Sequence, residues 1–338
     1  VAKALIKGVE NFYLYGIASR TKTKAEERIS KLKKSIEIFD LETLINNCQI
    51  IIDCAPKEAF RDIATQSINK GKKMNVGIVG FGSIGTEVAK ALLEGVENFY
   101  LYGISSRSKT NAEERISKLK KSIEIFDLET LINNCQIIID CAPKEAFRDI
   151  ATRCISEGKT LITVSGSGIL DNFDLIETSK KNNSQIILAT GAILGLDALR
   201  AAAESTIHSV KMTTRKPPNA LSKAPYVIKN NIEIDKLSKA KLIFKGSATE
   251  GAKAFPANVN VAAAVGLAGI GANKTELQIW ADPNLERNTH KVEVKSDSAE
   301  FEMSIQNVQT PENPGTGKIT GLSVIACLRS LKSFLKVG

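Results

Sequence analysis

The residues with the clearest chemical potential are three glycines in a G-x-G-x-x-G pattern: Gly80, Gly82 and Gly85. A short apolar run, 76–79, comes directly before them, and a segment with apolar residues at helical spacing follows. In such a strand–turn–helix the glycines allow the tight turn, the approach of a pyrophosphate and close helix packing. The amides at the helix start, Ser83 and Ile84, would face the phosphates. The pattern predicts a dinucleotide site; a tight turn without a ligand is the alternative.

The end of the next expected strand, 98–104, bears on which dinucleotide binds. Folds of this kind that prefer NAD place an Asp or Glu here to bind the ribose 2′-hydroxyl, and no acid follows this strand directly. Ser106 and Arg107 stand there instead, and a hydroxyl beside a guanidinium suits a 2′-phosphate. We therefore expect NADP, or both NADP and NAD, as cofactor; a basic surface loop is the alternative.

A strongly apolar strand is expected over 136–140, and Cys141 and Ala142 follow it. The carboxyl end of a strand in a dinucleotide-binding sheet faces the cofactor. We therefore expect Cys141 and Ala142 to line the same site.

Proton transfer needs a titratable group, and the sequence has two histidines, His208 and His290. A histidine of unperturbed pKa, about 6.5, exchanges protons near neutral pH. His290 follows a D-P-N turn and begins an expected strand, a position that readily presents a side chain. His208 lies between an expected helix and strand, where a structural role is favoured. His290 is thus the candidate acid–base group, with an ordinary strand-end histidine as the alternative.

The elements that must position these residues alternate between short apolar strands and helices along 74–195. This alternation is typical of a doubly wound parallel sheet, a Rossmann domain. Over 196–320 the pattern changes to period-two segments, which indicates an α+β catalytic domain with a mixed sheet. A C-terminal helix is expected within 321–338. The expected fold class is therefore α/β, with a dinucleotide-binding domain followed by a mixed-sheet domain.

Residues 1–72 repeat residues 88–159 almost letter for letter. The copy begins in the middle of the helix that should follow the glycine loop, so it has neither the loop nor the first strand. We interpret 1–73 as a partial duplicate of the Rossmann domain that cannot bind a pyrophosphate by itself. Met74 stands directly before the first strand, and the expected functional unit begins there.

The composition limits the classes of protein and partner. The 338 residues carry a formal net charge of +9, but basic and acidic residues are mixed, which favours a solvated surface over a nucleic-acid surface. No apolar run is long enough to span a membrane. The six cysteines are scattered, which predicts reduced thiols in a cytoplasmic protein. Two isolated histidines with dispersed acids predict no metal site.

From Met74 onward the chain resembles the L-aspartate dehydrogenase family. The motifs are GFGSIG, ATGAILGLDAL, FPANVNVAAAV, ADPNLERNTH and ENPGTG. The resemblance implies a homodimer in which the mixed-sheet domain builds the active site and the dimer contact. It implies NAD(P)-dependent oxidation of L-aspartate to iminoaspartate, which hydrolyses to oxaloacetate and ammonia or feeds NAD biosynthesis. It also implies that His290 is the catalytic residue and that Ala192 and Asn260 contact the nicotinamide.

Aspartate carries two carboxylates, so cationic or amide side chains must hold it. The candidates are Arg215, Lys216, Lys253, Asn258 and Asn260. Two alternatives remain: a related two-domain reductase of another amino acid or a semialdehyde, and a dinucleotide-binding protein without catalysis. The family usually has Lys and Ser where this chain has Gly315 and Gly317, and this departure keeps the second alternative open.

Overall fold

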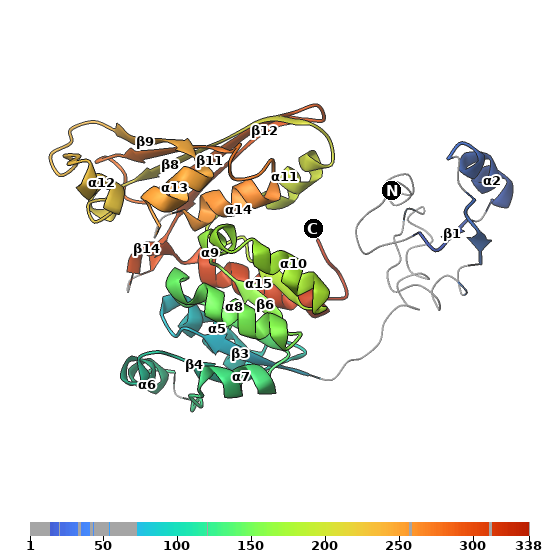
Figure 1. Ribbon diagram of the computed structural model, residues 1–338, viewed down its shortest axis with the longest axis horizontal. Helices are drawn as coiled ribbons and strands as arrows, with labels where there is room; N and C mark the ends of the chain where they lie inside the picture. The colour runs from blue at the N-terminus through green and yellow to red at the C-terminus, as the bar shows by residue number, and fades with distance from the viewer. Residues whose placement is uncertain are drawn as a thin grey trace. The chain divides into compact units, whose positions relative to one another are not determined.

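The computed structural model describes residues 14–19, 21–32, 35–40, 43, 54, 73–119, 121–256, 259–310 and 313–337. The chain forms two compact units, Val1–Gly71 and Lys72–Gly338. The larger unit contains the glycine loop and the two five-stranded sheets that build the candidate site (Figure 1).

The described part of the smaller unit is a short strand–helix–strand segment. It consists of β1 (Ile17–Ala18), α2 (Lys22–Ser30) and β2 (Ile38–Phe39), and β1 pairs with β2 in parallel. The corresponding sequence in the larger unit forms the end of a strand, a helix that is also nine residues long, α6 (Lys109–Ser117), and a parallel bridge between Ile104 and Ile125. In the described part of the first copy, the repeated sequence thus has the same local structure as in the second.

The first sheet of the larger unit has five parallel strands in the order β4-β3-β5-β6-β7. In that order they span Phe99–Ser105, Met74–Val79, Ile137–Asp140, Thr160–Thr163 and Gln185–Leu188. Its middle strands are apolar on both sides because helices cover both faces. Beside β4, Ile125 forms an isolated parallel bridge with Ile104, and Asp127 then caps the helix that follows.

Helices cover both faces of the parallel sheet. Ile137 and Ile139 face a core shared with α5 (Ser83–Gly95), α6 and α15 (Ile319–Lys332). Ile138 faces the other core, which is formed with α7 (Leu128–Asn134), α8 (Phe147–Ser156), α9 (Gly166–Asp171) and α10 (Asp174–Lys181). A short 3-10 turn, η2 (Lys144–Ala146), precedes α8.

The S-G-S-G segment after β6 leads directly into α9, which begins at Gly166. The absence of a Cβ allows this, because a Cβ on Gly166 would lie 2.7 Å from the carbonyl oxygen of Asn260. The final helix, α15, packs its Val324 and Leu328 into the Rossmann core, although its sequence follows the second domain.

The second sheet is mixed, with the strand order β12-β11-β8-β10-β9. In that order the strands span Glu300–Asn307, Asn288–Ser296, Ile207–Lys216, Glu276–Ala281 and Lys241–Ser247. Only the β8–β10 pair is parallel. The α/β architecture with a parallel and then a mixed sheet is therefore confirmed.

One face of the mixed sheet packs against the helices α11 (Leu196–Ala203), α13 (Ala248–Ala254) and α14 (Asn260–Ala268) (Figure 1). Their apolar side chains and the inward residues of the strands form one core. The remaining elements are short: η3 (Pro218–Ala220), α12 (Pro225–Lys229), β13 (Gln309–Thr310) and β14 (Asn313–Gly317).

Candidate functional site

The glycine loop connects β3 to α5 in a conformation that requires glycine. Gly80 has a φ of +87°, and a Cβ there would lie 2.6 Å from the backbone nitrogen of Ala142. A Cβ on Gly85 would collide with the carbonyl oxygen of Gly80. The first glycine therefore makes the turn and the third brings the helix close to it, as the motif predicts.

The second glycine leaves space for a ligand. A Cβ on Gly82 would meet no atom within 4 Å, so the backbone is open where a pyrophosphate is expected. Gly82 precedes α5 without a side-chain cap, and no acid lies in the first turn of that helix. The amides of Ser83, Ile84 and Gly85 thus begin a helix whose positive end is free of competing negative charge. These residues fit a dinucleotide diphosphate.

The residues expected to bind the ribose lie beside this loop. The amide of Gly80 donates to the carbonyl of Ser105 at the end of β4 (2.8 Å). Ser106 and Arg107 are the next two residues, so this bond holds them beside the glycine loop. The Ser106 hydroxyl donates to the Ser108 carbonyl (3.2 Å), and the Arg107 side chain is exposed. The structure thus places both residues at the glycine loop, where a ribose attached to the diphosphate would lie.

The end of β5 also meets the loop. Cys141 donates its amide to the carbonyl of Val79 (2.8 Å), which keeps Cys141 and Ala142 against the turn at Gly80. Asp140 fixes the bend: its carboxylate accepts from the amide of Ala142 (3.0 Å) and the hydroxyl of Thr163 (2.8 Å). Burial raises the pKa of Asp140 to about 6 and also raises the pKa of the Cys141 thiol, which therefore stays protonated.

The inward face of the mixed sheet changes from apolar to polar along its strands. On β8 the buried residues run from Val210 and Met212 to Thr214 and Lys216. On β11, Val294 and Val292 give way to His290 and Asn288, and β12 ends at the buried Asn307. Alternation along a strand puts such residues on one face. Five buried polar side chains thus gather at one end of the sheet.

This polar end shares a cavity of about 120 Å³ with the Rossmann domain. From the mixed-sheet domain, Lys216, Asn260 and His290 line it, and from the Rossmann domain Ile84 and Ala192 do so. Four residues expected to act at one site, Ile84, Ala192, Asn260 and His290, are therefore brought together. Gly317 lines it as well.

His290 is held in a definite orientation. Its Nδ1 atom lies 3.0 Å from the Thr214 hydroxyl on the paired strand β8. Burial, and then the charge of Lys216, lower the pKa of His290 to about 3, so its ring is neutral at pH 7. His208 lies outside the cavity, where Nε2 of its exposed ring is 2.7 Å from Oδ1 of Asp297.

The candidate carboxylate ligands separate into two groups. Lys216 lines the cavity and is only 4% exposed, and burial lowers its pKa to about 8. Arg215, the next residue, points to the opposite face, where it pairs with Asp282 (3.3 Å) and lies over Trp280. Lys253 is exposed and Asn258 lies outside the described residues. Of the cationic candidates, only Lys216 is in the cavity.

Asn260 connects the two domains at the start of α14. Its Oδ1 atom accepts from the amide (3.1 Å) and the hydroxyl (2.7 Å) of Ser167 in α9. The oxygen of this amide is therefore occupied, and its Nδ2 is the group that remains to bind an acceptor on a ligand.

Sequence reasoning did not identify Thr214, Asn288 or Asn307. The signal was present for Asn288, which stands two residues before His290 on an expected strand and so shares its face. No comparable signal marks Asn307, because its place in the cavity depends on the register in which β12 pairs with Asn288 of β11.

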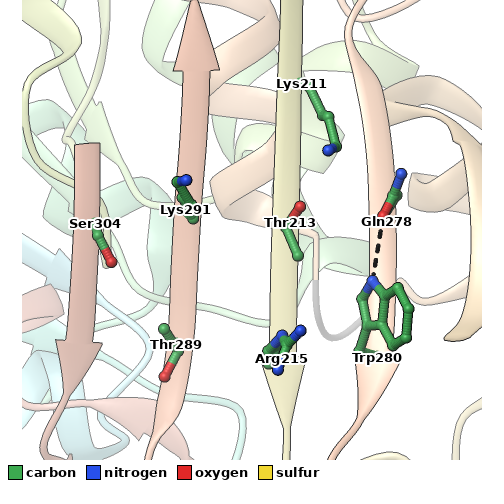
Figure 2. A pocket seen from close by; sticks show the side chains of 8 residues that line it. All are labelled: Lys211, Thr213, Arg215, Gln278, Trp280, Thr289, Lys291 and Ser304. Atoms are coloured by element: carbon green, nitrogen blue, oxygen red, sulfur yellow. Dashed lines mark hydrogen bonds between the residues drawn. The ribbon is translucent and has the colours of Figure 1, made fainter. Parts of the chain in front are cut away.

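A second hollow, of about 380 Å³, lies on the outer face of the mixed sheet (Figure 2). Lys211, Arg215, Trp280 and Lys291 line it together with smaller polar residues from β8, β10, β11 and β12. None of its lining residues comes from the Rossmann domain. This hollow is therefore separate from the cavity that contains His290, although it is larger.

Within the described ranges, no group of three or more His, Cys, Asp or Glu side chains could hold a metal ion. No helix in that part of the chain is long and apolar enough to cross a membrane.

A glycine loop on a parallel sheet, sharing a cavity with the polar end of a mixed sheet, defines a two-domain dinucleotide-dependent oxidoreductase. The model "Homoserine dehydrogenase, NAD binding domain" matches residues 1–77 and 80–189, thus both copies of the repeat. The model "Aspartate dehydrogenase, C-terminal" matches residues 197–331.

Individual relatives match both domains and share one activity in their names. The L-aspartate dehydrogenase of Bradyrhizobium diazoefficiens is 46% identical over 266 residues, which cover 79% of this chain and 94% of that protein. That of Methanosarcina barkeri is 35% identical, covering 78% and 99%. The crystal structure of aspartate dehydrogenase from Thermotoga maritima matches with a TM-score of 0.61 and 26% identity, covering 78% and 99%. The chain belongs to the L-aspartate dehydrogenase family.

Proposed function

We propose that this protein is an NAD(P)-dependent L-aspartate dehydrogenase, which converts L-aspartate to iminoaspartate that hydrolyses to oxaloacetate and ammonia. The observation that carries the proposal is the cavity in which His290 and Lys216 of the mixed sheet lie with Ile84 of the glycine loop. It combines a proton acceptor and a buried cation with the start of the helix that begins a dinucleotide site.

The Rossmann domain supplies the cofactor site. Gly80, Gly82, Ser83, Ile84 and Gly85 would bind the diphosphate, and Cys141 and Ala142 would line the same pocket. A nicotinamide dinucleotide bound there would supply the acceptor for the hydride that leaves Cα of the substrate. Ala192 and Asn260 would contact the nicotinamide side. Ser106 and Arg107 support a preference for NADP over NAD, because a 2′-phosphate suits a guanidinium and a hydroxyl without a neighbouring acid.

Lys216 is positioned to bind a substrate carboxylate. It is the cationic candidate in the cavity, and a carboxylate would offset the cost of burying its charge. The Nδ2 group of Asn260 provides a hydrogen-bond donor from the other side of the cavity. Both residues line the same small cavity as His290, so a substrate that they hold would lie beside the histidine.

His290 is the group we assign to proton transfer. In the tautomer whose Nδ1–H donates to the Thr214 hydroxyl, Nε2 has the free lone pair and would accept a proton from the substrate. The substrate ammonium must lose a proton before its nitrogen can share its lone pair with Cα as the hydride leaves. Negative charge on the bound carboxylates raises the pKa of a nearby histidine, which makes His290 a stronger base in the complex.

Initial rates of NADPH and NADH formation with a panel of L-amino acids test this function. We expect turnover with aspartate and no comparable rate with other amino acids. His290→Ala should lower kcat by about 10²-fold, the usual contribution of a positioned acid–base group, and leave cofactor affinity unchanged.

His208→Ala is the matched control, because that histidine is exposed and lies outside the cavity. Full turnover by His290→Ala would remove this residue from the mechanism. A preference for another amino acid or a semialdehyde would identify a related reductase instead, and cofactor binding without turnover would identify a non-catalytic protein. A homodimer stays a prediction that light scattering can check.

A further inference from the structure

Two buried amide oxygens in the cavity accept no hydrogen bond from any residue that the structure describes. They are the Oδ1 atoms of Asn288 and Asn307, and neither has a partner among the described residues. Both side chains are 3% exposed, and both line the cavity that contains His290. Buried polar atoms are nearly always paired in folded proteins. Two such acceptors at one place therefore indicate a ligand group that donates hydrogen bonds.

The orientation of the Asn307 amide is set by the protein. Its Nδ2 group donates to the carbonyl oxygen of Ala192 (3.1 Å), so its oxygen must point away from that bond. Gly317 makes room beside it, since a Cβ there would lie 3.1 Å from Oδ1 of Asn307. Asn288 is directly opposite Asn307 in the pairing of β11 with β12. The two acceptors thus come from neighbouring positions on one face of the sheet.

Two other polar groups of the cavity have the opposite character: the ammonium of Lys216 and the Nδ2 group of Asn260 are donors, which suits carboxylates. Asn288 lies two residues from His290 on the same face of β11, so its amide is next to the group that removes a proton. An amino group bonded to the same carbon as a carboxylate would therefore find acceptors on one side and donors on the other.

We propose that Oδ1 of Asn288 and Oδ1 of Asn307 accept hydrogen bonds from the α-amino group of the substrate, and so select amino acids over 2-hydroxy acids. This inference rests on the proposed function. An ammonium or amine offers two or more hydrogens and satisfies both acceptors, whereas a hydroxyl offers one and leaves an acceptor unpaired. Sites built to pair with a substrate polar group discriminate strongly against analogues that lack it.

The test is Asn288→Leu in the full chain, because no hydrogen bond of Asn288 to another described side chain would be lost. In the reductive direction, with oxaloacetate and NADPH, the KM for ammonium should rise by about 10- to 100-fold, the usual effect of losing a hydrogen bond to a charged group. The ratio of kcat/KM for L-aspartate to that for L-malate should fall by a similar factor. The Kd for NADPH, from fluorescence titration, should stay the same.

Thr289→Val is the matched control, since Thr289 lies on the same strand but lines the outer hollow. Asn288→Ala is a second variant, and thermal melting shows that each variant folds. An unchanged KM for ammonium in both variants would overturn the inference. So would a weaker Kd for NADPH at unchanged KM, because the oxygens would then bind the nicotinamide carboxamide. Failure of the proposed function is distinct, since the unsubstituted protein would then not oxidise aspartate.

Discussion

Replacing Lys216 with methionine should make the ligand-free protein more stable and the enzyme much less active. Lys216 is 4% exposed and lines the cavity from the end of β8, two residues beyond the buried Thr214. Burial lowers its pKa from 10.5 to about 8. This shift corresponds to a loss of about 3 kcal/mol in the free energy of unfolding while the amine is charged. Methionine has a similar length and no charge, so we expect a gain of about 1–3 kcal/mol at pH 7.

The stability difference between Lys216→Met and the unsubstituted protein should depend on pH. Below about pH 8 the lysine is charged in both states, and the folded protein bears the full cost of burial. Between about pH 8 and 10.5 the folded protein has released a proton that the unfolded chain still holds, so the stability of the unsubstituted protein rises with pH. The advantage of Lys216→Met should therefore shrink across this window and be lost above it.

Urea unfolding at a series of pH values measures the difference. Lys211→Met is the matched control, because Lys211 lies on the same strand, faces the outer hollow and pairs with Glu293 (3.4 Å); we expect a small effect that does not change with pH. In the same preparations, Lys216→Met should lower kcat/KM for aspartate by about 10²-fold, since a buried cation no longer binds the carboxylate. A less stable Lys216→Met protein at pH 7, or a difference independent of pH, would refute this account of the buried charge.

Three further predictions concern the cofactor and the repeat. Gly82→Val should abolish dinucleotide binding without unfolding the domain, because its side chain would fill the open space beside the loop; isothermal titration with NADPH checks this, and unchanged affinity would contradict the site. Arg107→Asp should shift the preference from NADP toward NAD, since attraction to a 2′-phosphate becomes repulsion; the ratio of the two kcat/KM values measures it, with Arg153→Asp on α8 as a control. Deleting residues 1–73 should preserve activity, because the glycine loop and every cavity residue lie after Met74; loss of cofactor binding would show that the first copy takes part in the working sheet.

The cofactor half of the site could be predicted from sequence because its signals are local. Gly80, Gly82 and Gly85 lie within six residues, and the strand before them and the helix after them are visible as apolar patterns. The roles of the glycines follow from the backbone alone, and the structure bears out the turn and the close helix contact. The domain limits at 195 and 320 stay predictions.

The substrate half could be predicted only in part, because it depends on pairing between distant strands. His290 and Lys216 were visible as titratable residues near strand ends, but Arg215 was an equal candidate until the alternation of β8 separated their faces. Asn307 enters the cavity through its register with Asn288, and Thr214 through its register with His290. No local pattern encodes either register.

The bond between Asn260 and Ser167 and the bond between Asn307 and Ala192 have one property in common: each joins the mixed-sheet domain to the Rossmann domain through one end of an amide whose other end faces the cavity. Rotating the domains apart would break these bonds and free both amides to turn. The two amides thus have the orientation that binds the substrate only while the domains are closed. Domain opening would release the product and would also free both amides to rotate. The time between successive turnovers would therefore include the time in which both amides regain their orientation.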